Sequence, residues 1–313
     1  MSLKLQPLVS VVTPVYNAEK WIGEAVESII DQKYVGEVLL VEDGSEDKSL
    51  SVCIELSERM PQVRIFRHDD GKNHWAAASR NLGIRHAKFE LIAFLDADDI
   101  YLPDRFGIPI QIMIENPAVD GVYEAIGTAV EDADAEKRWA AMGWGDITTV
   151  RKVLKPEELF YYLVMWEAGH FSLDGLVVKK NLLNRVGGLN KSLRLHEDTD
   201  ICIKMAAVGN LVPGRLDEPV ALRRVHARNT FITKRKNSLK SRLLVWRSLD
   251  DWAKESKQSL ARRLIIRYQL NRLQAFYFRR ERKWSAASFY SAKYLLMRRA
   301  IYMRRTILGA RSF

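Results

Sequence analysis

The chain has 313 residues, of which 47% are hydrophobic and 28% are charged. This composition is typical of a globular protein and excludes disordered and fibrous classes. No apolar run approaches the roughly 20 residues that span a bilayer, and no secretory signal pattern opens the chain, so we expect a cytoplasmic protein. Cys53 and Cys202 lie far apart within apolar helical patterns. This placement predicts reduced core thiols instead of a disulfide.

The formal net charge of +10 is distributed unevenly along the chain. Residues 234–313 contain 22 of the 49 Lys and Arg residues but only 4 of the 39 Asp and Glu residues. Residues 1–233 therefore keep 27 basic and 35 acidic residues. Such an asymmetry predicts two units, an acidic body over 1–233 and a basic helical region over 234–313.

The first hundred residues alternate short apolar runs with helical patterns. Buried strands are predicted at Val9–Thr13, Val38–Val41, Val63–Phe66 and Leu91–Leu95, and the first predicted helix covers Ile22–Ile30. Strands that alternate with helices favour a Rossmann-like, mostly parallel sheet flanked by helices. We therefore expect an α/β fold whose ligands bind beyond the carboxyl ends of the strands.

The rest of the body shows weaker patterns. Residues 130–155 have no sustained period and are predicted to be an irregular excursion or lid. A helix is expected from Pro156, a strand near Leu173–Val178, a helix opening at Glu197–Asp198 and a last strand at Val220–Val225.

Polar residues follow the predicted strands. Asp96 and Asp98, after the fourth strand, can direct oxygen ligands at Mg²⁺ or Mn²⁺, which neutralises charge on a diphosphate; a solvated acidic turn is the alternative. Asp43, with Gly44 allowing a tight turn, can accept from a ring N–H or form an Asx-turn. Tyr16 can stack on a base or be an ordinary rim aromatic.

Four motifs occur in a fixed order: Val9–Asn17 (VSVVTPVYN), Glu42–Ser45 (EDGS), Ala78–Gly83 (ASRNLG) and Phe94–Asp99 (FLDADD). Together they resemble the family 2 glycosyltransferases, densely over residues 1–110 and more loosely to about residue 230. The resemblance implies a GT-A fold, a nucleotide-diphospho-sugar donor of the UDP type, a divalent cation and inversion at the anomeric carbon.

The resemblance also implies roles in nucleotide binding. Pro14, Val15 and Tyr16 match the positions that line the base pocket, and Asp43 matches the residue that hydrogen-bonds the uracil. Arg80 falls where the family often places a basic contact to the nucleotide.

For the cation, Asp98 matches the carboxylate that ligates the metal most directly, and Asp96 is expected to contribute directly or through water. His226 falls where several relatives keep a histidine near the metal or the diphosphate. A surface histidine is the alternative for His226, with Arg224 or Arg228 contacting phosphate in its place.

The catalytic base is expected in the second half of the chain. The run Leu195–Asp198 (LHED) resembles the family's acidic motif, in which the aspartate removes the proton of the acceptor hydroxyl, so Asp198 is the predicted base. The alternative is that Glu197 and Asp198 only stabilise a helix N-terminus.

The basic region 234–313 interleaves aromatic residues with Lys and Arg in two or three amphipathic helices. It can bind an anionic membrane surface and so bring the enzyme to lipid-linked acceptors. Alternatively, its aromatic stripe packs on the body or on a second subunit of a homo-oligomer, or its charges bind a polyanionic glycan. Nucleic acid is disfavoured because no known binding module is recognisable.

These observations predict an inverting, metal-dependent glycosyltransferase that acts on a saccharide or lipid-linked acceptor in the synthesis of surface polysaccharide or glycolipid. One alternative is a nucleotidyltransferase of related fold, which would not depend on Asp198. The other is a non-catalytic basic scaffold with a nucleotide-sugar-binding body. The joint presence of Asp43, Asp96, Asp98 and Asp198 disfavours the scaffold.

Overall fold

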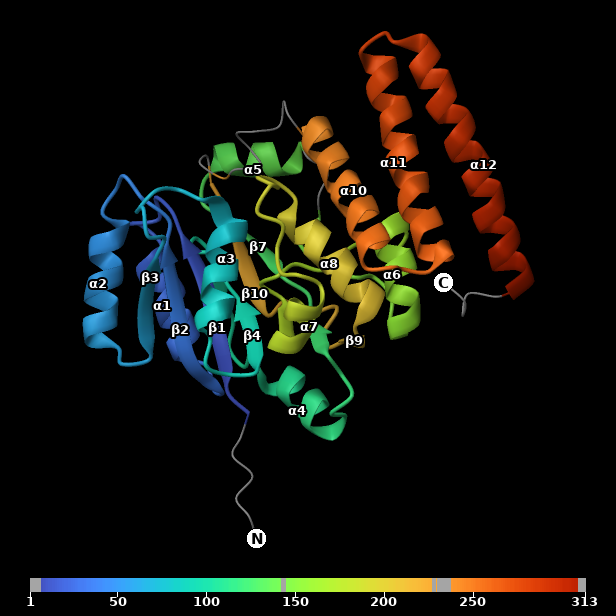
Figure 1. The fold of residues 1–313 in the computed structure, drawn as a ribbon. Coiled ribbons are helices and arrows are strands. Elements are labelled where there is room, and N and C mark those ends of the chain that lie inside the picture. Colours follow the sequence, from blue (N-terminus) through green and yellow to red (C-terminus); the bar gives the residue numbers. More distant parts are fainter. Residues whose placement is uncertain (1–6, 142–144, 227–228, 230–237, 309–313) are drawn as a thin grey trace.

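The computed structural model describes residues 7–141, 145–226, 229 and 238–308 (Figure 1). The strands are β1 Val9–Val15, β2 Val35–Glu42, β3 Val63–Arg67, β4 Leu91–Phe94, β5 Ile100–Tyr101, β6 Gly121–Tyr123, β7 Gly127–Val130, β8 Leu176–Lys179, β9 Leu211–Pro213 and β10 Ala221–Val225. The helices are α1 Ile22–Ile30, α2 Ser49–Arg59, α3 Trp75–His86, α4 Gly107–Glu115, α5 Ala133–Ala140, α6 Pro156–Met165, α7 Lys180–Arg185, α8 Glu197–Val208, α10 Ser238–Glu255, α11 Leu260–Arg280 and α12 Trp284–Leu308.

A seven-stranded sheet forms the centre of the body, with strand order β3-β2-β1-β4-β8-β6-β9. The first four strands are mutually parallel, whereas β8 runs antiparallel to both β4 and β6. A smaller sheet pairs β10 with β5 and β7. The prediction of an α/β fold with a mostly parallel sheet is confirmed.

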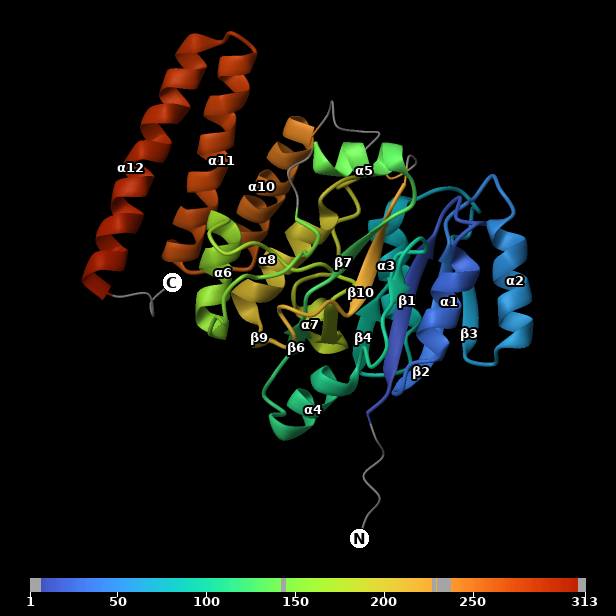
Figure 2. The same cartoon turned by 180° about the vertical axis from the view of Figure 1, so that it is seen from behind.

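Consecutive residues of β1 face opposite sides of the sheet. Val11 packs in one core cluster and Val12 in the other, and both are fully buried. This burial on both faces explains the unbroken apolar run in the sequence. Helices α1, α2 and α4 cover the face of Val11, and α3, α6 and α8 cover the face of Val12, as Figure 2 shows from behind.

Two contacts place the functional ends of the strands together. In the parallel register, Val15 lies beside Glu42, and Val12 lies beside Phe94, so β1, β2 and β4 end at the same edge. Gly83 lets α3 lie close to β1, because a Cβ at this position would collide with the Val12 side chain. The close approach brings α3 to the edge where the candidate site lies.

Two predicted segments differ from the structure. The prediction of an irregular excursion or lid over 130–155 is wrong about the irregularity of residues 133–140, because α5 forms there. Asp132 accepts from the Asp134 and Ala135 N–H groups, and Ala135 and Trp139 are buried against Val225. The predicted strand near Leu173–Val178 begins only at Leu176. The three residues before it form a turn in which the Leu176 N–H donates to the Leu173 C=O at 3.0 Å.

The C-terminal helices continue the core of the body. Helix α10 packs on α8, and α11 packs on α6, α10 and α12. Buried Trp246 and Ile265 belong to the same core cluster as Leu159 and Ile201. The aromatic stripe of α10 and α11 therefore packs largely on the body, and the boundary between 1–233 and 234–313 stays a prediction.

Two further expectations can be compared with the fold. Cys53 and Cys202 are both free and buried, as expected of core thiols, and burial raises the pKa of both. Among the described residues, no helix combines the length and apolarity that crossing a bilayer requires.

Candidate active site

The ends of β1 and β2 form the expected nucleotide side of the site. Tyr16 is 47% exposed and Pro14 is partly buried, whereas the Val15 side chain is fully buried in the core. The Val15 C=O accepts from the Asp43 N–H at 2.8 Å, which ties the two strand ends together. The Tyr16 ring is therefore accessible to a base, whereas the Val15 side chain anchors the end of β1 in the core.

Asp43 is nearly buried, and its carboxylate faces the segment before α3. Its Oδ1 accepts from the His74 N–H at 2.8 Å and lies 3.5 Å from His68 Nε2. Burial raises the pKa of Asp43, although the His74 N–H and the His68 ring act in the opposite direction. At the N-terminus of α2, the Ser49 N–H is capped by Asp47 instead. Asp43 is thus held by contacts with the segment before α3 and does not merely cap α2.

Gly44 allows this arrangement of Asp43. Its φ is +72°, and a Cβ there would lie 2.8 Å from the Asn73 backbone nitrogen. Only glycine combines that φ with such a close backbone approach without strain.

Arg80 links the carboxyl end of β4 to the N-terminus of α8. Its guanidinium donates to Asp96 Oδ1 and, at 2.9 Å, to Glu197 Oε1, and the residue is only 5% exposed. Burial by itself would lower the pKa of Arg80, but Asp96 and Glu197 raise it above its usual range, so the group stays charged. The guanidinium predicted to contact the nucleotide is bound here by two carboxylates.

An acidic cluster lies beside Arg80. Carboxylate oxygens of Asp96, Asp99 and Asp174 all lie within 4.8 Å of one another. Burial, reinforced by the neighbouring carboxylates, raises the pKa of Asp99 well above its usual range and that of Asp174 to about 6. Three oxygen donors whose ionised forms repel one another suit a divalent cation, which would offset the repulsion.

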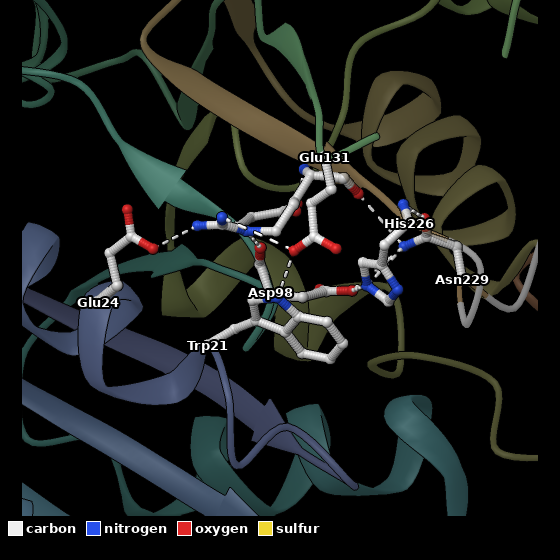
Figure 3. A network of polar contacts seen from close by, with 8 residues as sticks. Trp21, Glu24, Asp98, Glu131, His226 and Asn229 are labelled. Atoms are coloured by element: carbon white, nitrogen blue, oxygen red, sulfur yellow. Dashed lines mark hydrogen bonds and ion pairs between the residues drawn. The ribbon is translucent and has the colours of Figure 1, made fainter. Parts of the chain in front are cut away.

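The Asp98 carboxylate faces His226 (Figure 3). Its Oδ2 lies 3.0 Å from His226 Nε2 and accepts from Asn229 Nδ2 at 3.2 Å. Trp21 stacks on the His226 ring with centroids 4.1 Å apart, and its Nε1–H donates to Glu131 at 2.5 Å. Asp98 and His226, both predicted near the metal, are brought together.

Arg224 forms hydrogen bonds and an ion pair with other parts of the chain. Its Nε donates to the Asp98 C=O at 2.9 Å, and its Nη2 forms a 2.6 Å ion pair with Glu24. Its backbone N–H donates to Asp99 Oδ1 at 2.8 Å. Through these contacts, Arg224 stabilises the turn that contains Asp98 and Asp99. Arg228, the other arginine predicted to contact phosphate, lies outside the described residues.

Asp198 lies in the first turn of α8 and is partly buried. Its Oδ1 accepts from the Thr199 N–H at 2.6 Å. His170 and His196 are its neighbours: burial lowers the pKa of both imidazoles, and the Asp198 charge acts in the opposite direction. The adjacent Glu197 is the residue that binds Arg80, so the two acids of the motif face different partners.

Helix α3 connects these groups. The Ser79 hydroxyl lies 3.2 Å from His68 Nε2, and His68 in turn faces Asp43. Arg80, the next residue, reaches Asp96 and the residue preceding Asp198. The predicted nucleotide, metal and base positions are therefore joined by a short series of contacts.

Comparison with known proteins decides the family. Residues 10–173, just over half of the chain, match the model described as glycosyl transferase family 2. The chain belongs to this family.

Relatives of this glycosyltransferase agree with the assignment. It is 26% identical over 227 residues to an uncharacterized glycosyltransferase of Haemophilus influenzae, covering 72% of this chain and 71% of that protein. It is 33% identical over 122 residues to the Escherichia coli UDP-Glc:alpha-D-GlcNAc-diphosphoundecaprenol beta-1,3-glucosyltransferase WfgD, covering 38% of this chain and 47% of WfgD. The match thus spans less than half of the length of WfgD.

Solved structures confirm the GT-A fold. S. aureus TarS in complex with UDP superposes with a TM-score of 0.60 at 17% identity, covering 87% of this chain and 72% of that one. The mannosyltransferase PcManGT from Pyrobaculum calidifontis, in complex with GDP-Man and Mn²⁺, gives a TM-score of 0.56 at 17% identity, covering 98% and 86%. The resemblance drawn from the sequence motifs is confirmed at the level of family and fold.

Sequence reasoning missed several residues of this family 2 site. Asp174 stands out as a single acidic residue in the apolar stretch before β8, which is a signal that could have been used. Asn229 follows His226 by three residues, a spacing that lets its Oδ1 accept from the His226 N–H at 2.6 Å. Trp21 and Glu131 gave no local signal, because their contact joins segments 110 residues apart.

Proposed function

We propose that this family 2 glycosyltransferase transfers a sugar from a UDP-type donor to an acceptor hydroxyl with inversion at the anomeric carbon. The single observation that carries the proposal is the Arg80 bridge, because it joins the Asp96 carboxylate on the donor side to the helix that presents Asp198. TarS complexes with UDP and with UDP-GlcNAc, and the UDP-Glc donor named for WfgD, support the choice of nucleotide.

In this proposal, the uracil ring stacks on the exposed Tyr16 and donates its N–H to Asp43. Pro14 and Val15 support the same face. Asp43 suits the role because the His74 N–H and the His68 ring already favour its ionised form, which partly offsets the effect of burial.

The site residues fit a divalent cation, Mn²⁺ or Mg²⁺. Asp98 and His226 present an oxygen and a nitrogen 3.0 Å apart, and Asp96, whose carboxylate groups with those of Asp99 and Asp174, would contribute directly or through water. When bound, the cation would neutralise charge that develops on the departing diphosphate. The Mn²⁺ in the PcManGT complex supports this assignment.

Asp198 is the proposed general base. It takes the proton of the acceptor hydroxyl while the oxygen of that hydroxyl attacks the anomeric carbon from the face opposite the diphosphate, and UDP departs with the electrons of the broken bond. A positioned general base typically contributes about 10²–10⁴-fold. The Glu197–Arg80 ion pair holds the start of α8, so Asp198 keeps its place relative to the donor.

The proposed acceptor is a lipid-linked saccharide, in the synthesis of surface polysaccharide or glycolipid, at the cytoplasmic face of a membrane. WfgD, whose acceptor is a diphosphoundecaprenol-linked sugar, supports a lipid-linked acceptor. The chondroitin synthase of Escherichia coli, 27% identical over 235 residues but matched over only 31% of its length, supports a role in polysaccharide synthesis.

Calorimetry with UDP, in the presence of Mn²⁺ or of EDTA, tests the proposal. The intact chain should bind UDP, and Mn²⁺ should tighten binding. Asp98→Ala should lose the Mn²⁺ effect, whereas Glu58→Ala, which removes an exposed carboxylate on α2, should keep it. Absence of UDP binding, or binding indifferent to both Mn²⁺ and Asp98→Ala, would contradict the proposal.

A further inference from the structure

Helices α11 and α12 form an antiparallel hairpin that projects beyond the body (Figure 1). We define the hairpin tip as residues 276–293, which include the connection between the two helices. Three large aromatic side chains of the tip are more than half exposed: Phe276 at 59%, Trp284 at 65% and Phe289 at 54%. At about 1.5 Å of rise per residue, all three lie within roughly 8 Å of the turn along the helix axes.

The exposure of these rings does not follow from the packing of the hairpin. Helix α12 packs on α11 with the buried Ala287 and Ile301, and Phe278 stacks on Tyr290 with centroids 5.4 Å apart. The tip therefore has an internal aromatic contact of its own. Phe289 meets Tyr290 edge-on with centroids 5.2 Å apart but keeps more than half of its surface exposed, as do Phe276 and Trp284.

The tip is also strongly basic. Its exposed Lys and Arg residues are Arg279, Arg280, Arg282, Lys283 and Lys293, against the single acidic residue Glu281. The imbalance continues along both helices, since residues 260–308 contain 13 Lys and Arg residues and 1 acidic residue. Such a surface attracts an extended negatively charged partner.

Aromatic rings and basic groups lie next to one another at the hairpin tip. The Lys293 ammonium lies 4.3 Å from the centroid of the Phe289 ring, and Arg279 donates to the Ser291 hydroxyl at 2.9 Å. Aromatic rings beside Lys and Arg are typical of elements that sit at the headgroup level of a membrane, with rings in the interface and cations on the phosphates.

The hairpin tip and the candidate active site lie toward the same side of the molecule. In Figures 1 and 2, the strands β1 and β2 run from the end near the N-terminus toward the side on which the hairpin projects. A flat surface that touches the tip therefore lies on the side where these strands end, and not on the side of the N-terminus.

We propose that the hairpin tip inserts its aromatic rings into the interface of an anionic membrane and so turns the active site toward that surface. The acceptor hydroxyl would then be presented from the lipid side; this part rests on the proposed function. Three half-exposed rings offer roughly 300 Å² of apolar surface, well below the ~800 Å² per partner of a stable protein interface. A convex tip of that size suits lipid better than a second copy of the chain.

Flotation of the full chain tests the proposal. The vesicles are made of phosphatidylcholine mixed with phosphatidylglycerol, and pure phosphatidylcholine serves as the neutral reference. The chain should float with the anionic vesicles, less so at high salt, and should remain behind with the neutral ones.

Two pairs of variants separate the tip from the rest of the hairpin. Arg280→Glu/Arg282→Glu should lower the partition coefficient at least about tenfold, since each basic residue near an anionic surface contributes roughly fivefold. Arg298→Glu/Arg299→Glu, with the same charge change farther from the tip, should have the smaller effect.

For the aromatic residues, Trp284→Ser/Phe289→Ser should abolish flotation, whereas Leu296→Ser/Tyr302→Ser should preserve it. The control residues are 66% and 72% exposed and lie farther along α12.

Calorimetry with UDP is measured on every variant. Unchanged UDP affinity shows that the variants fold, and it keeps the failure of membrane binding distinct from the failure of the proposed function. The proposal is overturned if the intact chain does not float or if tip and control variants lose flotation equally. It is also overturned if sedimentation shows a dimer that the tip variants abolish, because the tip would then bind a second copy.

Discussion

Replacing Arg80 with methionine removes the guanidinium that joins Asp96 to Glu197 while keeping an unbranched side chain of similar length. In the native site, the Arg80 and Glu197 side chains are only 6% and 15% exposed, whereas Asp96 is 39% exposed. The two carboxylates therefore respond differently. Asp96 can regain water, but Glu197 is left as a buried and uncompensated charge.

Removal of one partner of a buried ion pair costs about 3–5 kcal/mol. We expect Arg80→Met to lower the free energy of unfolding by about 3 kcal/mol at neutral pH, the low end of that range, because Glu197 keeps some exposure and Asp96 contributes little once solvated.

The loss should depend on pH in a defined direction. Burial already raises the pKa of Glu197 above 4.5, with Arg80 acting against the rise. Without Arg80, the folded-state pKa rises further above the unfolded value. The cost of the ionised carboxylate is then full above the folded-state pKa and disappears as pH falls through it toward 4.5.

Urea unfolding, followed by tryptophan fluorescence across a pH series in EDTA, measures these effects. Arg80→Met/Glu197→Gln should recover part of the stability at neutral pH, because no buried charge remains. The reasoning is refuted if Arg80→Met is as stable as the native chain, if its deficit does not change with pH, or if the double variant is no more stable than Arg80→Met.

Three further changes address the base, the acidic cluster and the cation. Asp198→Asn should keep binding of UDP and Mn²⁺ but lose transfer at least about 10²-fold in a donor-consumption assay, and normal turnover would exclude Asp198 as the base. Burial raises the pKa of Asp174 from 3.8 to about 6, so in EDTA the free energy of unfolding should fall as pH rises through this window. Asp174→Asn should flatten that part of the profile of unfolding free energy against pH, and an unchanged slope would contradict the assignment. Trp21→Leu removes both the ring stacked on His226 and the donor to Glu131. It should therefore weaken Mn²⁺-dependent UDP binding more than Trp21→Phe, which keeps a ring. Equal UDP affinities of the two variants in calorimetry would show that the Trp21 ring does not position His226.

The strands and the order of the motifs were readable from the sequence because both depend on local patterns. A run such as Val9–Thr13, apolar at every position, is buried on both faces of a parallel sheet wherever it occurs. Since parallel strands end at the same edge, residues that follow them, such as Asp43 and Asp98, were expected at one site. Local chemistry also predicted the start of α8 at Glu197.

The missed helix α5 shows where local patterns are too weak. Half of its eight residues are charged, and among its described side chains only Ala135 and Trp139 are buried, against Val225 of a distant strand. Two inward positions give no sustained period, so the Asp132 cap was the one local indication of a helix.

By itself, the sequence determined the fold class, the family and the positions of the acidic residues, because periodicity and motif spacing are properties of contiguous segments. The tertiary structure decided which groups share a partner. It paired Arg80 with both Asp96 and Glu197, and it paired Asp98 with His226 while grouping Asp96 with Asp99 and Asp174. It also divided the basic C-terminal region into helices that pack on the body and a tip that does not. These contacts join residues far apart in the chain, and long-range contact is set by packing, which no local pattern records.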